Sequence, residues 1–507
     1  MIYPQFDHIV TLARDYNVIP VCQTFLADTE TPIGLLQKNK QNDHAFLLES
    51  VEGAARWARY SFVGSDPFLI FAARDGEMRI QQRNGTTEIR TGNPLESLEE
   101  LVSEYRCPKY EGYPPFLGGC VGSLGYEMIQ YIERIPTADS DPLQSQDLHF
   151  MFYDRLCVFD HLKQQVIAVQ LIHVPEQDPD IELLRERYDA AKKQLSAWIA
   201  FLQSNESTRM VTPAVQDVEA NVSLKYRSNM TKDAFMRQVA KAQEAIRAGD
   251  VQQVVLSQRL EVDVTIDPFD VYRVLRTLNP SPYMYYLQMG EETIVGASPE
   301  VLVKVQDGQV ETRPIAGTRK RGNTVEEDQC LAEELLNDDK ERAEHEMLVD
   351  LGKEELGRVC EPGTVELKQF MEVEYYSHVM HIVSHVIGQL RSPYSPFQAL
   401  TACFPAGTVS GAPKRHAMEM IAALEGERRG IYAGGIGYMA FSGNVDTCIA
   451  IRTIVFKQGK AYIQAGAGIV ADSVPENEYD ESLNKARALL TALARAQILF
   501  QPTVQRS

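Results

Sequence analysis

The sequence predicts an α+β fold in which large, antiparallel-rich sheets pack against helices. Short apolar stretches between Gly, Pro and Asp turns, such as FLLESV, YSFVG and QVIAVQLIHV, predict strands in the amino-terminal part. Further along, capped helices alternate with glycine-rich strands such as YAGGIGYMAF and AYIQAGAGIV. With 507 residues, 44% of them hydrophobic, the chain is long and apolar enough to bury large cores without disulfides.

The chain divides into two predicted domains at a polar linker. From Leu202 to Met230 it lacks a sustained hydrophobic period, which is typical of a linker. The residues before it, Glu182–Leu202, carry an acidic and basic pattern that predicts a long helix. We expect an amino-terminal domain over residues 1–205 and a longer second domain over residues 226–500.

The first helix after the linker has clear start and stop signals. Thr231 is a candidate N-cap and Gly249 a candidate stop. Between them, apolar residues recur at i, i+4, i+7 and i+11, namely Phe235, Val239, Ala242 and Ile246. The next stretch, VQQVVLSQRLEVDV, predicts a strand.

Composition argues against several function classes. With 50 Lys and Arg against 70 Asp and Glu, the net charge is −20, which argues against nucleic acid or an anionic membrane as partner. The eight cysteines form no CxxC motif, which favours scattered buried thiols. The first residues, MIYPQFDHIV, lack a secretory pattern, and no apolar run reaches the roughly 18 residues of a membrane span. We therefore expect a cytoplasmic protein.

Two pairs of glutamates are the most informative feature of the sequence. Glu341 and Glu344 lie three apart on one predicted helix, so their carboxylates share a face. Glu478 and Glu481 repeat that spacing near the start of the last helix, where Pro475 suits the first turn. Each pair alone is also typical of a solvated acidic helix face. If the two helices meet, four carboxylates converge, and their repulsion favours a bound hard cation such as Mg²⁺.

Glycine-rich segments give a weaker signal. Gly466–Gly468 and Ala433–Gly435 allow a ligand to approach the main chain closely, but neither has the spacing of a phosphate-binding loop. The segment GGCVG, Gly118–Gly122, fits the nucleophile elbow of glutamine amidotransferases, with His173 and Glu176 as candidate partners. Those enzymes place the His two residues before the Glu, whereas the spacing here is three, so a structural strand is favoured.

Six motifs together resemble those of the chorismate-utilising enzymes. In chain order they are PIAGTRKRG (Pro314–Gly322), AEHEMLVDL (Ala343–Leu351), FPAGTVSGAPK (Phe404–Lys414), YAGGIGY, IRTIV and AGAGIVADSVPENEYDESLNKARAL, spread between Asn229 and Ala494. Within that family the chain is most similar to the large subunits of anthranilate synthases. The resemblance implies a large α/β fold, Mg²⁺ dependence, and a heterotetramer with a glutamine amidotransferase subunit that supplies ammonia.

The resemblance implies that the glutamate pairs form a metal site. Glu344 and Glu481 would hold Mg²⁺, with Glu341 and Glu478 supporting it directly or through water. The ion would bind the ring carboxylate of chorismate. It would stabilise the charge that develops there as the diene rearranges.

The resemblance also implies catalytic and substrate-binding residues. Glu300, in GASPEVLV, would protonate the departing 4-hydroxyl, a role that favours a raised pKa. His381, in HVMHIVSHV, would assist the elimination of pyruvate from 2-amino-2-deoxyisochorismate, with Thr408 as a further catalytic residue. The residues implied to bind the substrate are Gly317, Thr318, Tyr432, Arg452, Ala467, Gly468 and Lys485.

Two positions distinguish members of the family. Members that add water to chorismate carry a Lys where this chain has Gln253, which cannot act as a base. Members that put nitrogen on C4 carry a nucleophilic Lys where this chain has Ala316, which removes the covalent route. The resemblance therefore implies that ammonia adds at C2.

Two further segments resemble the binding site of the feedback inhibitor tryptophan. They are LLES (Leu47–Ser50) and NPSPYMYY (Asn279–Tyr286), which on pattern alone are also typical of a buried strand and of a turn before another strand. A glutamate there could take the ligand ammonium, and a proline and a methionine could pack against its indole. The effector residues implied are Glu49, Ser50, Pro282, Tyr283 and Met284.

The expected function is Mg²⁺-dependent conversion of chorismate and ammonia to anthranilate and pyruvate, a lyase reaction that begins tryptophan biosynthesis and is inhibited by tryptophan. Three alternatives stay open. They are a 2-amino-2-deoxyisochorismate synthase without the lyase step, an aminodeoxychorismate synthase component I, and a catalytically silent scaffold that binds the glutaminase or senses tryptophan. One segment, Lys353–Glu355, departs from the Arg-Asn-Asp that is usual in the family, and we expect it to lie at the periphery of the metal site.

Overall fold

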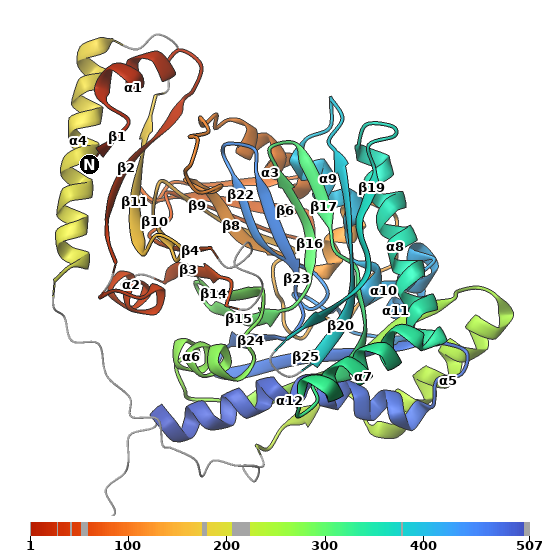
Figure 1. The fold of residues 1–507 in the computed structure, drawn as a ribbon. Helices are drawn as coiled ribbons and strands as arrows, with labels where there is room; N and C mark the ends of the chain where they lie inside the picture. Colours follow the sequence, from red (N-terminus) through yellow and green to blue (C-terminus); the bar gives the residue numbers. More distant parts are fainter. Residues whose placement is uncertain are drawn as a thin grey trace, which may run out of the picture.

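A computed structural model describes residues 2–27, 29–40, 43–51, 59–174, 180–204, 224–376 and 379–500. Two large antiparallel sheets form the centre, and helices cover their outer faces (Figure 1). The predicted α+β class with antiparallel-rich sheets is therefore confirmed.

The first sheet combines strands from both ends of the chain. Its neighbouring strands, in order, are β1 (Ile2–Tyr3), β2 (Val18–Leu26), β11 (Gln165–His173), β10 (Arg155–Asp160), β4 (Tyr60–Ser65), β3 (His44–Glu49), β14 (Tyr283–Met289), β15 (Glu292–Ser298), β24 (Thr453–Lys457), β25 (Lys460–Ile469), β13 (Gln253–Asp263) and β12 (Arg227–Ser228), with β21 (Gly411–Ala412) also paired to β13. The two halves of the chain meet where β3 pairs with β14.

The second sheet has the same mixed origin. Its order is β18 (Ile315–Lys320), β20 (Val379–Gln389), β17 (Gln309–Thr312), β16 (Val301–Gln306), β23 (Val445–Ile449), β22 (Gly435–Ala440), β8 (Gly119–Leu124), β9 (Leu148–Tyr153), β5 (Leu69–Arg74), β6 (Glu77–Gln82) and β7 (Thr87–Thr91), with β19 (Glu366–Tyr375) paired to β20. Here the halves meet where β22 pairs with β8. Main-chain hydrogen bonds thus join residues 1–205 to residues 226–500 in both sheets.

Helices pack on the outer faces of the sheets. In Figure 1, α4 stands at one edge beside β2 and β11, while α12 runs beneath β25 next to α5 and α6. On the other side, α8 contacts β18, β20 and α9. The described helices are α1 (Phe6–Leu12), α2 (Pro32–Asn39), α3 (Pro94–Ser103), the 3₁₀ helix η1 (Tyr126–Tyr131), α4 (Ile181–Leu202), α5 (Lys232–Ala248), α6 (Pro268–Leu278), α7 (Val325–Asn337), α8 (Asp339–Val359), α9 (Pro396–Cys403), α10 (Gly407–Ser410), α11 (Lys414–Glu425) and α12 (Pro475–Phe500).

The strand β14 shows how one sheet serves two cores. Successive side chains of a strand point to opposite faces. Tyr285 and Leu287 pack in the core between the sheets, whereas Met284 and Tyr286 pack in the core beneath the helices. Because both faces are covered, the strand reads as a continuous apolar run in the sequence rather than as an alternating one.

Several predicted elements are confirmed. The helix before the linker is α4, and α5 begins at Thr231, whose hydroxyl accepts the Ala234 N–H, and ends at Gly249 with φ 86°. The predicted linker is only partly a linker, since Arg227 and Ser228 pair with β13. Its residues 205–223 lie outside the described residues.

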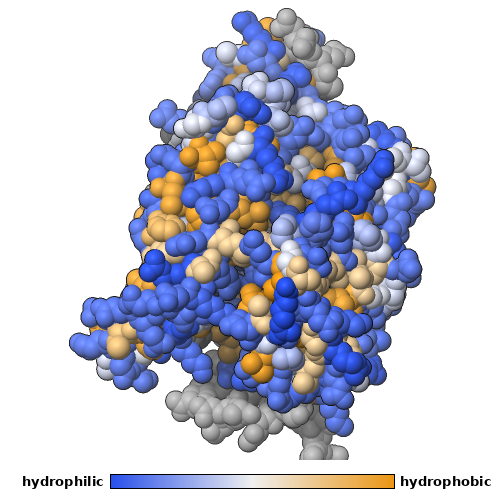
Figure 2. Space-filling view, turned by 90° about the vertical axis from the view of Figure 1, so that its right-hand side faces the viewer, coloured by the Kyte–Doolittle hydropathy of each residue, from blue (hydrophilic) through white to orange (hydrophobic). Residues whose placement is uncertain are grey.

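The nucleophile-elbow interpretation of GGCVG is excluded by burial. Cys120 lies in the interior strand β8, fully buried, and burial raises the pKa of its thiol. Of the eight cysteines, seven are buried and Cys330 is exposed. None of the helices in the described ranges is long and apolar enough to cross a membrane. The face that carries α8 and β19 is mostly hydrophilic, with hydrophobic residues interspersed (Figure 2).

Candidate active site

Glu300 is a buried carboxyl between β15 and β16. Its backbone carbonyl accepts the Ile449 N–H at 3.0 Å, which ties it to β23. The residue is 7% exposed, and desolvation raises the pKa of its carboxyl to about 8, against the opposing effects of Thr408, the Ile315 N–H and the Lys485 charge. The group therefore keeps its proton at neutral pH and can act as an acid.

Thr408 lies opposite this carboxyl. It sits in α10, a single turn, and its hydroxyl lowers the pKa of Glu300. Its buried Oγ1 completes no hydrogen bond of good geometry within the described part of the chain. A buried polar atom of this kind favours a ligand as partner, because leaving it unbonded costs free energy.

His381 is fixed in one tautomer by β18. Its Nδ1 lies 2.9 Å from the Gly317 carbonyl oxygen and 3.1 Å from Thr318 Oγ1. Because a carbonyl oxygen only accepts, Nδ1 carries the hydrogen, and Nε2 of the neutral ring is the basic nitrogen. Desolvation lowers the pKa of His381, and the charge of Arg452 acts in the same direction. The neutral, Nε2-basic form is therefore favoured.

A bulge at Gly317 brings this histidine close to the first glutamate pair. The register of β18 shifts between Ala316 and Thr318, and Gly317 has φ +70°. A Cβ there would lie 3.2 Å from Glu341 Oε2 and 3.0 Å from Leu335. Glycine therefore lets the Glu341 carboxylate lie directly against β18, the strand whose Gly317 carbonyl contacts His381.

The glutamates of α8 have different partners. Glu341 pairs with Arg319 at 3.2 Å, and burial raises the pKa of Glu341, as does the nearby charge of Glu344. Glu344 accepts a 2.8 Å hydrogen bond from Gln253 Nε2. A Cβ at Gly468 would lie 2.7 Å from that same nitrogen. Gln253 thus links α8 to the glycine-rich strand β25.

The glutamates of α12 form the second pair. Burial raises the pKa of Glu478, and the charge of Glu481 acts in the same direction. Glu481 pairs with Lys485 at 2.8 Å. Lys340 of α8 lowers the pKa of Glu478, so the starts of the two helices lie within electrostatic reach.

The four carboxylates have the chemistry that a hard cation needs. All are oxygen donors, and for one member of each pair burial and its neighbour raise the pKa, an effect that a divalent ion would offset. In the described ranges, no three His, Cys, Asp or Glu side chains converge as a ready ligand set. Both pairs lie near the site, but the structure does not bring all four together.

Arg452 and Lys485 are the positively charged residues predicted for the candidate site. Arg452 donates to the Lys485 carbonyl oxygen at 3.1 Å, and Lys485 Nζ donates to the Gly466 carbonyl oxygen at 3.1 Å. Burial lowers the pKa of Arg452, and the charge of Arg452 acts to lower the pKa values of His381 and Tyr432. Tyr432 is buried, and burial raises the pKa of its hydroxyl to about 12. Ala467 and Gly468 lie beside them in β25.

A buried ion pair behind the site was not expected from the sequence. Arg429 is 1% exposed and bonds both oxygens of Glu425 at 2.6 and 2.8 Å. The same guanidinium donates to the carbonyl oxygens of Val409 and Val255. The i, i+4 spacing of the pair was a signal, but it is equally common on exposed helices.

The residues of the departure at Lys353–Glu355 differ in their partners. Glu354 pairs with Arg358 on the surface, but Glu355 is buried and pairs with Lys414, the last residue of the motif FPAGTVSGAPK. Glu355 therefore anchors the segment that carries Thr408.

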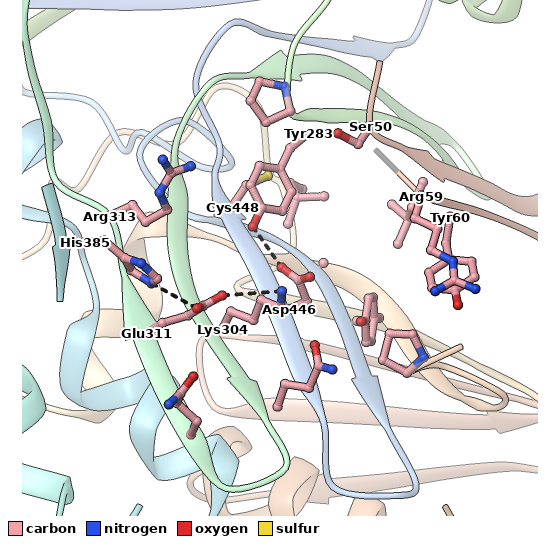
Figure 3. A pocket seen from close by; sticks show the side chains of 18 of the residues that line it. Ser50, Arg59, Tyr60, Tyr283, Lys304, Glu311, Arg313, His385, Asp446 and Cys448 are labelled. Atoms are coloured by element: carbon pink, nitrogen blue, oxygen red, sulfur yellow. Dashed lines mark hydrogen bonds and ion pairs between the residues drawn. The ribbon is translucent and has the colours of Figure 1, made fainter. Parts of the chain in front are cut away.

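The predicted effector residues come together at a second cavity. In the register of β3 and β14, Met284 lies opposite Glu49. All five effector residues line a cavity of about 1060 Å³, part of which is drawn in Figure 3. This volume is large enough for a small ligand.

The carboxylates of this cavity differ in their partners. Glu49 accepts hydrogen bonds from Tyr272 and Arg276, each at 2.6 Å, so it is already paired. Asp446 accepts from Tyr283 at 2.9 Å, and burial raises the pKa of the Asp446 carboxyl. Figure 3 shows Lys304 beside Asp446 and Glu311, and Glu311 contacts His385 at 3.0 Å. These partners were not predicted from the sequence.

Comparison with known proteins identifies relatives over nearly the whole chain. A family model described as chorismate binding enzyme matches residues 44–491. Anthranilate synthase component 1 of Acetivibrio thermocellus is 48% identical over 496 residues, covering 98% of this chain and 99% of the relative. The protein of the same name from Aquifex aeolicus is 44% identical over 493 residues, covering 97% and 98%.

Solved structures share the fold. The crystal structure of anthranilate synthase component I from Streptococcus pneumoniae superposes with a TM-score of 0.74 at 38% identity, covering 87% of this chain and 93% of that one. The menaquinone-specific isochorismate synthase of Escherichia coli superposes with a TM-score of 0.69 at 19% identity, covering 96% and 98%. At that low identity the second likeness concerns the fold alone.

Proposed function

The chain belongs to the family of chorismate-binding enzymes, and from that premise we propose that it is the large subunit of an anthranilate synthase. It converts chorismate and ammonia to anthranilate, pyruvate and water. The observation that carries the proposal is a pair of groups whose pKa values burial shifts in opposite directions. Glu300 is kept protonated, and His381 is kept neutral with a basic Nε2. An acid and a base in one site are what the two steps require.

Glu300, His381 and Thr408 each have a role in the two steps of the reaction. Glu300 donates its proton to the 4-hydroxyl of chorismate, which leaves as water while ammonia adds at C2. His381 then accepts the ring proton at Nε2 as the enolpyruvyl group leaves and the ring becomes aromatic. Thr408 bonds the substrate near Glu300 and completes the catalytic set.

Binding falls to the cations and the glycine-rich main chain. Arg452 and Lys485 attract the substrate carboxylates. The main chain of β25 and the bulge of β18 allow close approach, and Tyr432 closes the pocket. The proposed substrate contacts are Gly317, Thr318, Tyr432, Arg452, Ala467, Gly468 and Lys485.

The glutamate pairs of α8 and α12 would hold Mg²⁺. Glu344 and Glu481 would bind it, with Glu341 and Glu478 supporting directly or through water. When bound, the ion supplies a positive charge that stabilises the ring carboxylate. Gln253, which donates to Glu344, keeps that carboxylate oriented toward β25.

The nucleophile is ammonia because the chain offers no base to activate water at Gln253 and no nucleophilic lysine at Ala316. A glutamine amidotransferase subunit supplies it in a heterotetramer. The complex works in the cytoplasm, where a protein with seven buried, unpaired thiols stays reduced.

Tryptophan binds in the cavity that the ends of β3 and β14 help to line, and it inhibits the reaction. Ser50, Pro282 and Met284 surround the ligand beside Tyr283. Glu49 shares its carboxylate with Tyr272 and Arg276, so it receives the ligand ammonium as part of a network rather than alone.

The test uses the purified chain with chorismate, Mg²⁺ and an ammonium salt at mildly alkaline pH. Anthranilate fluorescence, with and without tryptophan, reports formation and inhibition, and chromatography resolves the products. Anthranilate that falls on adding tryptophan supports both parts of the proposal. An accumulating amino intermediate would replace it with the enzyme that lacks the lyase step, isochorismate would contradict the assignment of ammonia, and unchanged chorismate in the complete complex would favour a scaffold.

A further inference from the structure

Glu127 is a buried carboxylate that binds two backbone N–H groups of the other half of the chain. It lies in η1, directly after β8, and is 5% exposed. Its Oε1 accepts the Arg429 N–H at 2.7 Å, and its Oε2 accepts the Gly430 N–H at 2.9 Å. The neighbouring Tyr126 N–H donates to the Gly430 carbonyl oxygen at 2.7 Å. Three hydrogen bonds thus fix one short turn.

The turn held by Glu127 leads to one of the proposed substrate contacts. It connects α11 to β22, and Gly430 has φ +62°. Two residues further lies Tyr432, one of the proposed substrate contacts. Without the two carboxylate oxygens, both N–H groups would lose their partners in a buried place, which costs free energy and loosens the turn.

The side chain of Arg429 extends this control to two other pocket segments. Its guanidinium donates to the Val409 carbonyl oxygen at 2.8 Å and to the Val255 carbonyl oxygen at 2.7 Å. Val409 follows Thr408, and Val255 lies two residues after Gln253. The guanidinium also lies over the Tyr432 ring at 5.4 Å. The Arg429 side chain therefore contacts three segments that carry Thr408, Gln253 and Tyr432.

We propose that Glu127 is a positioning residue for chorismate binding, acting through Arg429 on the segments that carry Thr408, Gln253 and Tyr432. The inference deepens the proposed function and rests on it. A carboxylate is required because only two acceptor oxygens satisfy both N–H groups. Burial raises the pKa of Glu127 to about 7, against the opposing N–H groups, so the carboxylate form prevails at the mildly alkaline pH of the assay. The amide of glutamine has the same shape but places an NH₂ group against one of them.

The experiment compares the wild-type chain with E127Q in the ammonia-dependent assay. We expect the KM for chorismate to rise about tenfold, the kcat to change less than about threefold, and the KM for ammonium to stay unchanged, because the change weakens positioning and not the acid or base. Calorimetric titration of chorismate with Mg²⁺ present should show a matching loss of affinity. E127D, which keeps both oxygens, should recover part of it.

The matched control is E292Q. Glu292 is also a buried carboxyl, 6% exposed, with Ser145 at 3.0 Å and Lys457 at 3.9 Å as its partners. The E292Q variant should have a lower unfolding temperature than the wild type but an unchanged KM for chorismate. If E127Q leaves the KM and the chorismate affinity as in E292Q, Glu127 is merely structural and the proposal is wrong.

Two further results would be informative. If E127Q does not fold, E127D decides. Because Asp keeps both oxygens on a shorter side chain, E127D should raise the KM for chorismate and weaken its binding moderately relative to the wild type, and a KM and affinity equal to those of E292Q would contradict the positioning role. A wild-type chain that binds chorismate but forms no anthranilate would refute the proposed reaction, while the affinity of E127Q still tests the positioning role.

Discussion

The Nδ1 atom of His381 lies 2.9 Å from the carbonyl oxygen of Gly317, across the bulge of β18. This contact leaves Nε2 as the basic nitrogen of a neutral ring. It exists because Gly317 adopts φ +70°, which turns its carbonyl toward β20. One glycine thus sets both the tautomer of the proposed base and the space for the Glu341 carboxylate.

Replacing His381 should separate the two chemical steps. In His381→Met, ammonia addition continues while elimination slows, so 2-amino-2-deoxyisochorismate should accumulate and anthranilate formation should fall by about 10²-fold or more. Chromatography of timed reactions measures both compounds. His385→Met is the control, because His385 lies on the same strand but contacts Glu311 in the other cavity. Anthranilate at the native rate from His381→Met would refute the assignment.

Glu300 should impose an upper pH limit on turnover. Burial raises its pKa to about 8, so the acid form is lost as the pH rises through that value. At constant NH₃ concentration, kcat should fall above a pH of about 8. Glu300→Gln should lose about 10² to 10⁴-fold in activity and the remaining rate should lack this limb. A pH profile of Glu300→Gln that still matched the wild type would contradict the role.

The same raised pKa affects stability with a defined sign. Between the ordinary value of 4.5 and about 8, the folded chain holds a proton on Glu300 that the unfolded chain has released. The contribution of Glu300 to the free energy of unfolding is therefore complete below pH 4.5 and is lost as the pH rises through about 8. Unfolding free energies measured across that range should decline less steeply in Glu300→Gln than in the wild type.

Gly317→Ala tests the bulge directly. Any L-residue at φ +70° costs about 1–2 kcal/mol, and here the added Cβ also meets Glu341 and Leu335. We expect Gly317→Ala to lower the kcat of the folded enzyme, in addition to lowering its free energy of unfolding. Gly363→Ala is the matched control, since φ is +81° and nothing lies within 4 Å of the added Cβ. Equal kinetics in the two variants would show that the contact with Glu341 is unimportant.

The glutamate pairs should control the response to Mg²⁺. Removing Glu481 takes away one proposed ligand, so Glu481→Gln should weaken both the Mg²⁺ dependence of activity and the rise in unfolding temperature that Mg²⁺ produces. The control is Glu476→Gln on the same helix, where Glu476 pairs with Lys232 at the surface. Normal titration by Mg²⁺ in Glu481→Gln would remove the metal role.

The sequence predicted those features that depend on local chemistry. The caps Thr231 and Gly249 bound α5 as expected, because a cap acts on backbone groups only a few residues away. The spacing of Glu341 and Glu344 likewise placed both on α8. The resemblance identified the segments around Glu49 and Met284, and the register of β3 and β14 brings them side by side.

Partners distant in the sequence could not be predicted. Glu127 and Arg429 meet only because β8 and β22 are neighbours, and nothing in either local pattern signals that pairing. Glu49 was predicted to bind the ammonium group of the effector, but Tyr272 and Arg276 of α6 already donate hydrogen bonds to its carboxylate. Such long-range pairing follows from topology, so it required the structure.

Ser50→Phe should relieve inhibition by tryptophan while sparing turnover. Ser50 follows β3 at the wall of the cavity, near Tyr283, and its side chain is small enough to leave room for an indole (Figure 3). A phenyl group fills that space, so tryptophan would have to displace it. We expect the inhibitory constant to rise by about tenfold or more.

The kinetics of this variant distinguish a blocked site from a damaged enzyme. The cavity is lined by residues of several strands, including β3, β14, β23 and the far end of β20, but neither Glu300 nor His381 lines it, so the kcat and the KM for chorismate should stay within about twofold of the wild type. Calorimetry should show that tryptophan binding is lost in parallel with inhibition. Tryptophan that still inhibits Ser50→Phe at its native concentration would place the effector away from Ser50.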